Sequence, residues 1–145
     1  MSEENVEIVR QAFDALNAGL RGEIAEENVA QVAQRFFDPQ FEQDWPLGQE
    51  WPDQPPHFRG LPALMSFIEQ VRSAWLDLAF EPLEFIEAPG DRVLTPVRQT
   101  GRGRESGIPI VIHFFLVFTL RDGKVRKQEF FRHRADALEA AGLSG

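Results

Sequence analysis

The sequence contains no cysteine in its 145 residues. Without thiols the chain can form neither a disulfide framework nor a thiolate metal site, and it has no cysteine nucleophile. Tyrosine is also absent, and the three histidines, at positions 57, 113 and 133, do not have the spacing of metal ligands. We therefore expect neither a metal nor a cofactor.

The sequence also lacks a long uninterrupted apolar run. The longest one, Ile108 to Leu120, is broken by a proline, a histidine and a threonine. It is shorter than the roughly 20 residues that a membrane-spanning helix needs. We expect no membrane association and interpret this segment as a buried strand.

Basic residues are too few for a nucleic-acid-binding protein, since the formal net charge is -8. The cluster Arg98, Arg102 and Arg104 is interpreted as a solvated strand end. The acidic start, Met1 to Glu4, is unlike the basic and then apolar regions of a signal peptide. A soluble, cytoplasmic protein that binds no nucleic acid is the expectation.

Three segments carry apolar residues at helical spacings of three and four. They are Val6 to Leu20, with Ser2 as a candidate N-cap, Glu26 to Phe37, which ends at Asp38-Pro39, and Leu64 to Trp75, with Pro62 at the first helical position. The sequence predicts three N-terminal helices.

After these helices the pattern is typical of β-strands separated by turn residues. The predicted strands are Phe41 to Trp45, Leu78 to Ala88, Arg92 to Arg102, Pro109 to Arg121 and Lys124 to His133. A proline-rich stretch, 46 to 56, is expected to be an irregular loop that could act as a lid. Helices followed by consecutive strands predict a single α+β domain, residues 1–145, with the helices on one face of an antiparallel sheet.

The strand 110 to 120 is apolar on both faces. Ile110, Ile112, Phe114, Leu116 and Phe118 alternate with Val111, Phe115 and Val117. A sheet covered by helices on one side should instead be polar on the other. A second subunit is the simplest cover, so we expect a homodimer through the sheet, with His113 at its interface.

Several short motifs occur together along nearly the whole chain. They are the opening helix Val6 to Gly19, Phe36-Phe37-Asp38-Pro39 leading into Phe41-Glu42-Gln43-Asp44-Trp45, the loop exit Phe58-Arg59-Gly60, Gly101 to Pro109, Phe118 to Lys124, and the closing Asp136-Ala137-Leu138. In this combination the chain resembles the nuclear transport factor 2-like superfamily, in the branch of ketosteroid isomerases and SnoaL-like polyketide cyclases.

The resemblance implies a cone made by a strongly curved antiparallel sheet and closed by the helices, with a ligand pocket in its open mouth. It also implies a sheet-packed homodimer. It implies no single activity, because this fold serves isomerases, cyclases, epoxide hydrolases and binding modules.

Asp44 matches the position of the general base in ketosteroid isomerases, and is the catalytic candidate. The oxyanion donors of that enzyme have no counterpart, since their positions fall on Ala12 or Phe13 and on Leu116. The aspartate of the polyketide cyclases falls near Phe130. The aspartate-arginine-aspartate relay of epoxide hydrolases is not found. A structural role for Asp44, paired with Arg59 or Arg132, stays open beside catalysis.

The expected pocket has an aromatic wall with a few polar groups, which suits an apolar, flat or polycyclic small molecule. Its predicted substrate-binding residues are Trp45, Trp51, His57, Phe67, Leu116, Phe118, Gln128, Phe130 and Arg132. Two hypotheses follow. One is a cofactor-free isomerase, cyclase or lyase that uses Asp44 as base, and the other is a non-catalytic module that binds an apolar metabolite or a protein.

Overall fold

The computed structural model describes residues 2–44 and 57–143. Within these ranges the chain forms four α-helices and seven strands. The helices are α1 (Ser2–Leu20), α2 (Val29–Phe36, preceded by the 3₁₀ turn Glu26–Asn28), α3 (Leu61–Ala74) and α4 (Arg134–Ala140). The strands are β1 (Phe37–Asp44), β2 (His57–Arg59), β3 (Trp75–Pro82), β4 (Ile86–Ala88), β5 (Arg92–Gly103), β6 (Pro109–Arg121) and β7 (Lys124–Phe131).

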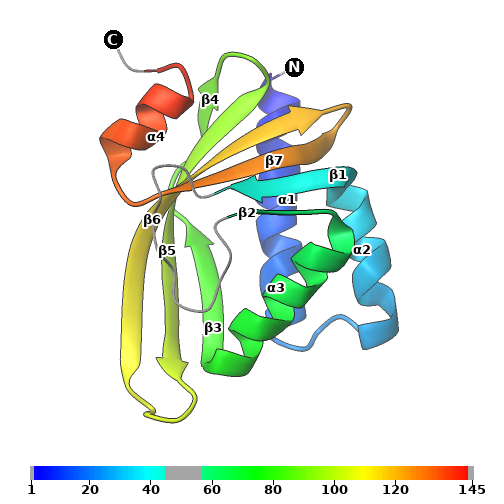
Figure 1. Ribbon diagram of the computed structural model, residues 1–145, viewed down its shortest axis with the longest axis vertical. Coiled ribbons are helices and arrows are strands. Elements are labelled where there is room, and N and C mark those ends of the chain that lie inside the picture. Colours follow the sequence, from blue (N-terminus) through cyan, green and yellow to red (C-terminus); the bar gives the residue numbers. More distant parts are fainter. Residues whose placement is uncertain (1, 45–56, 144–145) are drawn as a thin grey trace.

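All seven strands belong to one sheet in the order β2-β1-β7-β6-β5-β3, with β4 beside β5. Figure 1 shows the long strands bending across the molecule, with α1, α2 and α3 on one side of the curved sheet and α4 beyond its upper left edge. The predicted α+β fold is confirmed. The sheet is mixed, however, because β1 runs parallel to β7. No hairpin joins these two strands, so no short turn forces them to be antiparallel.

Several predicted element ends were wrong. Strand β1 begins at Phe37 instead of Phe41, and the expected strand 78–88 divides into β3 and β4. The third helix ends before Trp75, which opens β3. Helix α4 was not predicted, because its seven residues are too few to show a clear period.

The Trp75 ring packs against Gly101 of β5, where the absence of a side chain leaves room for it. A Cβ at Gly101 would lie 2.8 Å from Cε3 of the Trp75 ring and 3.2 Å from the Leu76 carbonyl oxygen. Both positions lie where β3 pairs with β5. The glycine therefore allows the indole to lie across the sheet.

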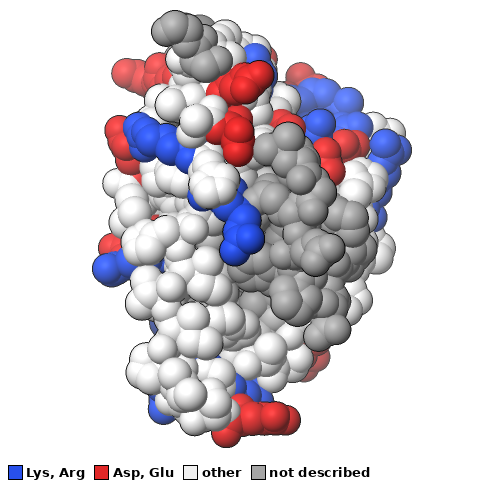
Figure 2. Space-filling view, turned by 60° about the vertical axis from the view of Figure 1, so that its left-hand side comes forward, with Lys and Arg blue, Asp and Glu red and all other residues white. Residues whose placement is uncertain are grey.

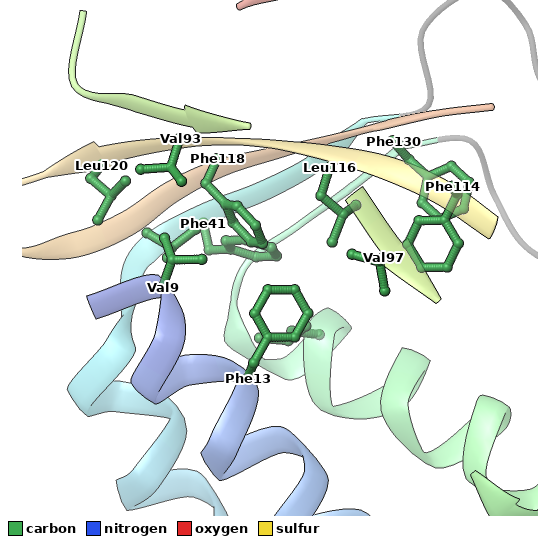
Figure 3. Packing of buried hydrophobic residues seen from close by; sticks show 12 residues of the cluster. Val9, Phe13, Phe41, Val93, Val97, Phe114, Leu116, Phe118, Leu120 and Phe130 are labelled. Atoms are coloured by element: carbon green, nitrogen blue, oxygen red, sulfur yellow. The ribbon is translucent and has the colours of Figure 1, made fainter. Parts of the chain in front are cut away.

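The main core lies between the concave face of the sheet and the helices. Figure 3 shows Phe13 reaching from α1 toward Phe118 and Leu116, with Val9 and Phe41 packed nearby. The completely buried members include Val9, Phe41, Val93, Val97 and Val125. The predicted inward face of β6, with Phe114, Leu116 and Phe118, is confirmed.

The convex face has a smaller core under α4. Leu94, Val117 and Phe131 are buried there against Ala137 and Ala141 of the helix. The expectation that a second subunit covers this whole face was therefore wrong for the part around Val117. A short helix of the same chain covers it.

Apolar side chains stay exposed at the start of β6 and in the turn before it. Ile108 is 60% exposed and Val111 is 56% exposed. Figure 2 shows a largely uncharged surface in the lower part of the molecule, bordered below by acidic and basic side chains. A homodimer through this strip stays a prediction.

No helix in the described residues is long and apolar enough to cross a membrane.

Candidate functional site

A large cavity lies between the concave face of the sheet and helices α1, α2 and α3. Its volume is about 1740 Å³, compared with the roughly 300–1,000 Å³ of common ligand pockets. Small residues of α1 and α2 contribute to it, namely Ala12, Ala15, Gly19, Ala30 and Ala33. Their short side chains keep the two helices from filling the space.

Aromatic rings form much of the cavity wall. Phe114 of β6 stacks on Phe130 of β7, with ring centroids 4.3 Å apart and planes 22° apart. Phe13 meets Phe118 edge to face at 5.8 Å. These contacts fix the rings and leave an apolar surface that suits flat ligands.

Two neighbouring glutamines bring polar groups to this wall. Gln43 of β1 is only 1% exposed, and its Oε1 accepts a hydrogen bond of 3.0 Å from Nε2 of Gln128 on β7. Both side chains line the cavity. Their Cα atoms are partners in the parallel β1–β7 ladder, which places the two carboxamides side by side.

A third carboxamide comes from β5. Gln99 is 3% exposed and lines the cavity, and its side chain makes no hydrogen bond to the described residues. Its carboxamide atoms are not among the fully buried unpartnered atoms, so they are accessible from the cavity. Thr95 lies four residues before Gln99 on the same face of β5. It is also buried with an unpartnered hydroxyl, but it does not line the cavity.

Ionisable side chains reach the cavity only at exposed positions. Among the described lining residues they are Glu26, Glu69, Arg72, Arg104 and Arg132. All five are solvent-exposed, so they lie where the cavity opens. The buried part of the described wall is therefore uncharged.

Asp44, the predicted base, is not one of the described lining residues. On β1 the buried Phe41 and Gln43 face the core and the cavity, and the intervening Glu42 points the other way. Strand alternation puts Asp44 on the same side as Glu42. Its Cα partner is Glu129 of β7. A catalytic role for Asp44 stays a prediction, and its place in the sheet does not support it.

Glu129 has an unusual environment on that convex face. Burial raises the pKa of its carboxyl, and the nearby carboxylates of Asp44 and Glu42 act in the same direction, while Lys127 and Arg92 oppose them. The perturbed acid lies beside Asp44 and outside the cavity wall. It therefore marks the convex face as the charged one.

Glu42 lies close to several basic side chains at this edge of the sheet. Arg126, Arg59 and His57 approach its carboxylate at 3.4, 3.5 and 3.9 Å. Arg59 pairs with Glu42, and a structural role for Asp44 through Arg59 or Arg132 stays a prediction. His57 is exposed and does not line the cavity.

The other predicted binding residues have different outcomes. The structure places on the cavity wall Phe67, Leu116, Phe118, Gln128, Phe130 and Arg132. Trp45 and Trp51 lie outside the described residues. That any of these side chains touches a ligand stays a prediction.

Sequence reasoning missed Gln43 and Gln99. Strand alternation was the available signal, since Phe41 fixes the inward face of β1 and Val93 and Val97 fix that of β5. Within residues 2–44 and 57–143 no cluster of three or more histidine, aspartate or glutamate side chains is arranged to hold a metal ion.

The sequence model of a family described as SnoaL-like domain matches residues 9–128. No curated protein matches the sequence significantly. Among solved structures, an NTF2-like protein from Burkholderia xenovorans LB400 is 26% identical, with 97% of each chain covered and a TM-score of 0.69.

Two further structures share the fold at lower identity. A SnoaL-like protein from Jannaschia sp. CCS1, provisionally named a polyketide cyclase, is 20% identical, with 100% of this chain and 95% of that chain covered and a TM-score of 0.71. The epoxide hydrolase/cyclase-like enzyme SalBIII, described in pyran ring formation in the polyether salinomycin, is 18% identical, with coverages of 92% and 94% and a TM-score of 0.68.

Proposed function

Because the chain belongs to the SnoaL-like domain family, we propose that its cavity binds a neutral, largely apolar small molecule that carries a few oxygen substituents. The observation that carries this proposal is the chemistry of the wall. The wall combines aromatic rings with three carboxamides, and every ionisable lining residue of the described chain is exposed. A charged ligand would lose its hydration there without gaining a buried counterion.

The reaction class that fits such a ligand is a cofactor-free cyclisation or isomerisation. SalBIII and the Jannaschia protein are described with cyclase names. Carboxamides can hydrogen-bond a carbonyl or hydroxyl group, but they are not bases at neutral pH. Ligand binding is therefore the function that the described wall supports best, and turnover would need a base from elsewhere.

Nile red, a neutral fused-ring ketone whose emission rises in apolar surroundings, is a suitable probe. We expect saturable binding of one molecule per chain, with a dissociation constant of roughly 1–10 µM. Ile112 and Val111 provide a matched pair, because they are neighbours on β6 and only Ile112 lines the cavity. Ile112→Trp should weaken binding at least tenfold, while Val111→Trp should change it less than twofold.

Absence of saturable binding, or equal effects of the two tryptophan variants, would rule out this cavity as the site. Asp44→Asn belongs in the same titration. Since Asp44 is not on the described wall, its variant should bind Nile red as the wild type does. A tenfold change would instead bring Asp44 into the site and favour the catalytic hypothesis.

A further inference from the structure

Gln99 is a polar side chain with no hydrogen-bond partner among the described residues. It is 3% exposed, it lines the cavity, and it makes no hydrogen bond to the described residues. Its carboxamide atoms are absent from the set of buried unpartnered atoms, so they are reached from the cavity. Its donor and its acceptor are therefore both available to a molecule in the cavity.

The pair Gln43–Gln128 offers a second polar position. Its internal hydrogen bond uses the Gln43 carbonyl oxygen and one N–H of Gln128. A carboxamide has two N–H donors and one acceptor oxygen. The amide nitrogen of Gln43 and the carbonyl oxygen of Gln128 therefore also have hydrogen-bonding capacity left for a ligand.

The two polar positions are far apart along the sheet. Gln128 lies opposite Phe118 on β6, whereas Gln99 lies opposite Ile112 on the other side of the same strand. From 112 to 118 is six positions, at most about 20 Å of extended strand, and the curvature of the sheet shortens this distance through space. The stacked rings of Phe114 and Phe130 lie between the two positions along the strands.

We infer that the cavity selects an elongated, neutral ligand with a hydrogen-bonding oxygen at each end, one bound by Gln99 and the other by Gln43–Gln128, and with its apolar body on the Phe114–Phe130 stack. This inference rests on the proposed function. Gln99 is then a specificity residue. It discriminates between ligands that share one body and differ in the group at one end.

The test uses three neutral probes of one shape: trans-stilbene, 4-hydroxystilbene and 4,4′-dihydroxystilbene, titrated by fluorescence. The wild type should bind the dihydroxy probe roughly tenfold more tightly than the monohydroxy probe, because only the former occupies both polar positions. In the near-isosteric variant Gln99→Met this ratio should fall to about one, and the affinity for trans-stilbene should not decrease.

Ile112→Met is the matched control, since Ile112 is the cross-strand partner of Gln99 and also lines the cavity. It should change the affinities of all three probes by a common factor. The melting temperature of ligand-free Gln99→Met should not fall, since no hydrogen bond is lost; a clear fall would assign Gln99 a structural role and overturn the inference.

The affinities separate the two proposals. A preference for the second hydroxyl group that survives in Gln99→Met, or no preference in the wild type, overturns the inference and leaves the proposed function standing. Binding of Nile red without binding of any stilbene likewise overturns the inference and leaves the proposed function standing. If neither Nile red nor a stilbene binds the wild type, both proposals fail.

Discussion

The two faces of the same pair of strands differ in chemistry. On the concave face β1 and β7 present Gln43 and Gln128, which are hydrogen-bonded to each other. On the convex face they present Glu42, Asp44 and Glu129. Because side chains alternate along a strand, a shift of one residue would exchange the carboxamides for carboxylates. The register of β1 and β7 thus decides whether the cavity is neutral or acidic.

The largest expected effect comes from placing a carboxylate among the carboxamides of the concave face. Gln43→Glu should destabilise the fold by about 3–5 kcal/mol at pH 8, because a buried carboxylate would replace an amide. The burial raises the pKa of the new carboxyl above its unfolded value. The loss of stability is therefore complete above the pKa of this carboxyl in the folded protein, and it disappears below about pH 4. Chemical denaturation at the two pH values measures it.

Gln40→Glu is the matched control, with the same change at an exposed position of the same strand. Its carboxylate would lie near Arg121, which already contacts the Gln40 side chain. We expect a change within about 0.5 kcal/mol at both pH values. Equal losses for the two variants would mean that Gln43 is not in an apolar environment.

A smaller effect should follow from removing the buried carboxylate at the start of β1. Asp38 accepts a 2.7 Å hydrogen bond from the Gln40 backbone N–H and pairs with Arg121 at 2.9 Å. Burial opposes ionisation, but these two partners outweigh it and hold the pKa of Asp38 below its ordinary value. Asp38→Ala should therefore cost about 2 kcal/mol at pH 7.

The pH dependence has a definite sign. A carboxyl with a lowered folded pKa stabilises the protein above its unfolded pKa, and this contribution is lost as the pH falls through the lower folded value. The gap between wild type and Asp38→Ala should narrow in strong acid. Asp38→Asn keeps an acceptor for Gln40, so it should lose less than the alanine variant, and equal losses would contradict the role of that hydrogen bond.

The smallest expected effect concerns Glu129 on the convex face. Because the pKa of Glu129 is raised in the fold, its ionised form is destabilising. Stability should therefore decrease as the pH rises through the window between its unfolded and folded values. Glu129→Gln should gain up to about 0.5 kcal/mol at pH 8 and nothing at pH 4. Thermal melts measure this, with Glu87→Gln on exposed β4 as the control. A loss at pH 8 would contradict it.

Apolar periodicity was sufficient to predict the three N-terminal helices and the two faces of β6. It could not predict that β1 joins the sheet in parallel to β7, since that pairing joins segments more than 80 residues apart and no local pattern encodes it. Helix α4 was missed for a related reason. Its stability comes from packing against Val117 and Phe131 rather than from its own short sequence.

The apolar wall was also predictable, because Leu116, Phe118 and Phe130 follow from strand alternation. The polar part was not. The resemblance directed attention to Asp44, while glutamine, which is mostly exposed in proteins, drew none. Alternation from the buried Phe41 predicts an inward side chain at position 43, next to the family's catalytic position.

Trp75 can report events in the cavity by its fluorescence. The sequence has three tryptophans and no tyrosine, so tryptophan alone emits when the protein is excited in the near ultraviolet. Trp75 lies on the cavity wall, against Gly101. A chain with phenylalanine at positions 45 and 51 would keep a single indole at this wall. Its emission would report the arrival of a ligand directly, with no added dye.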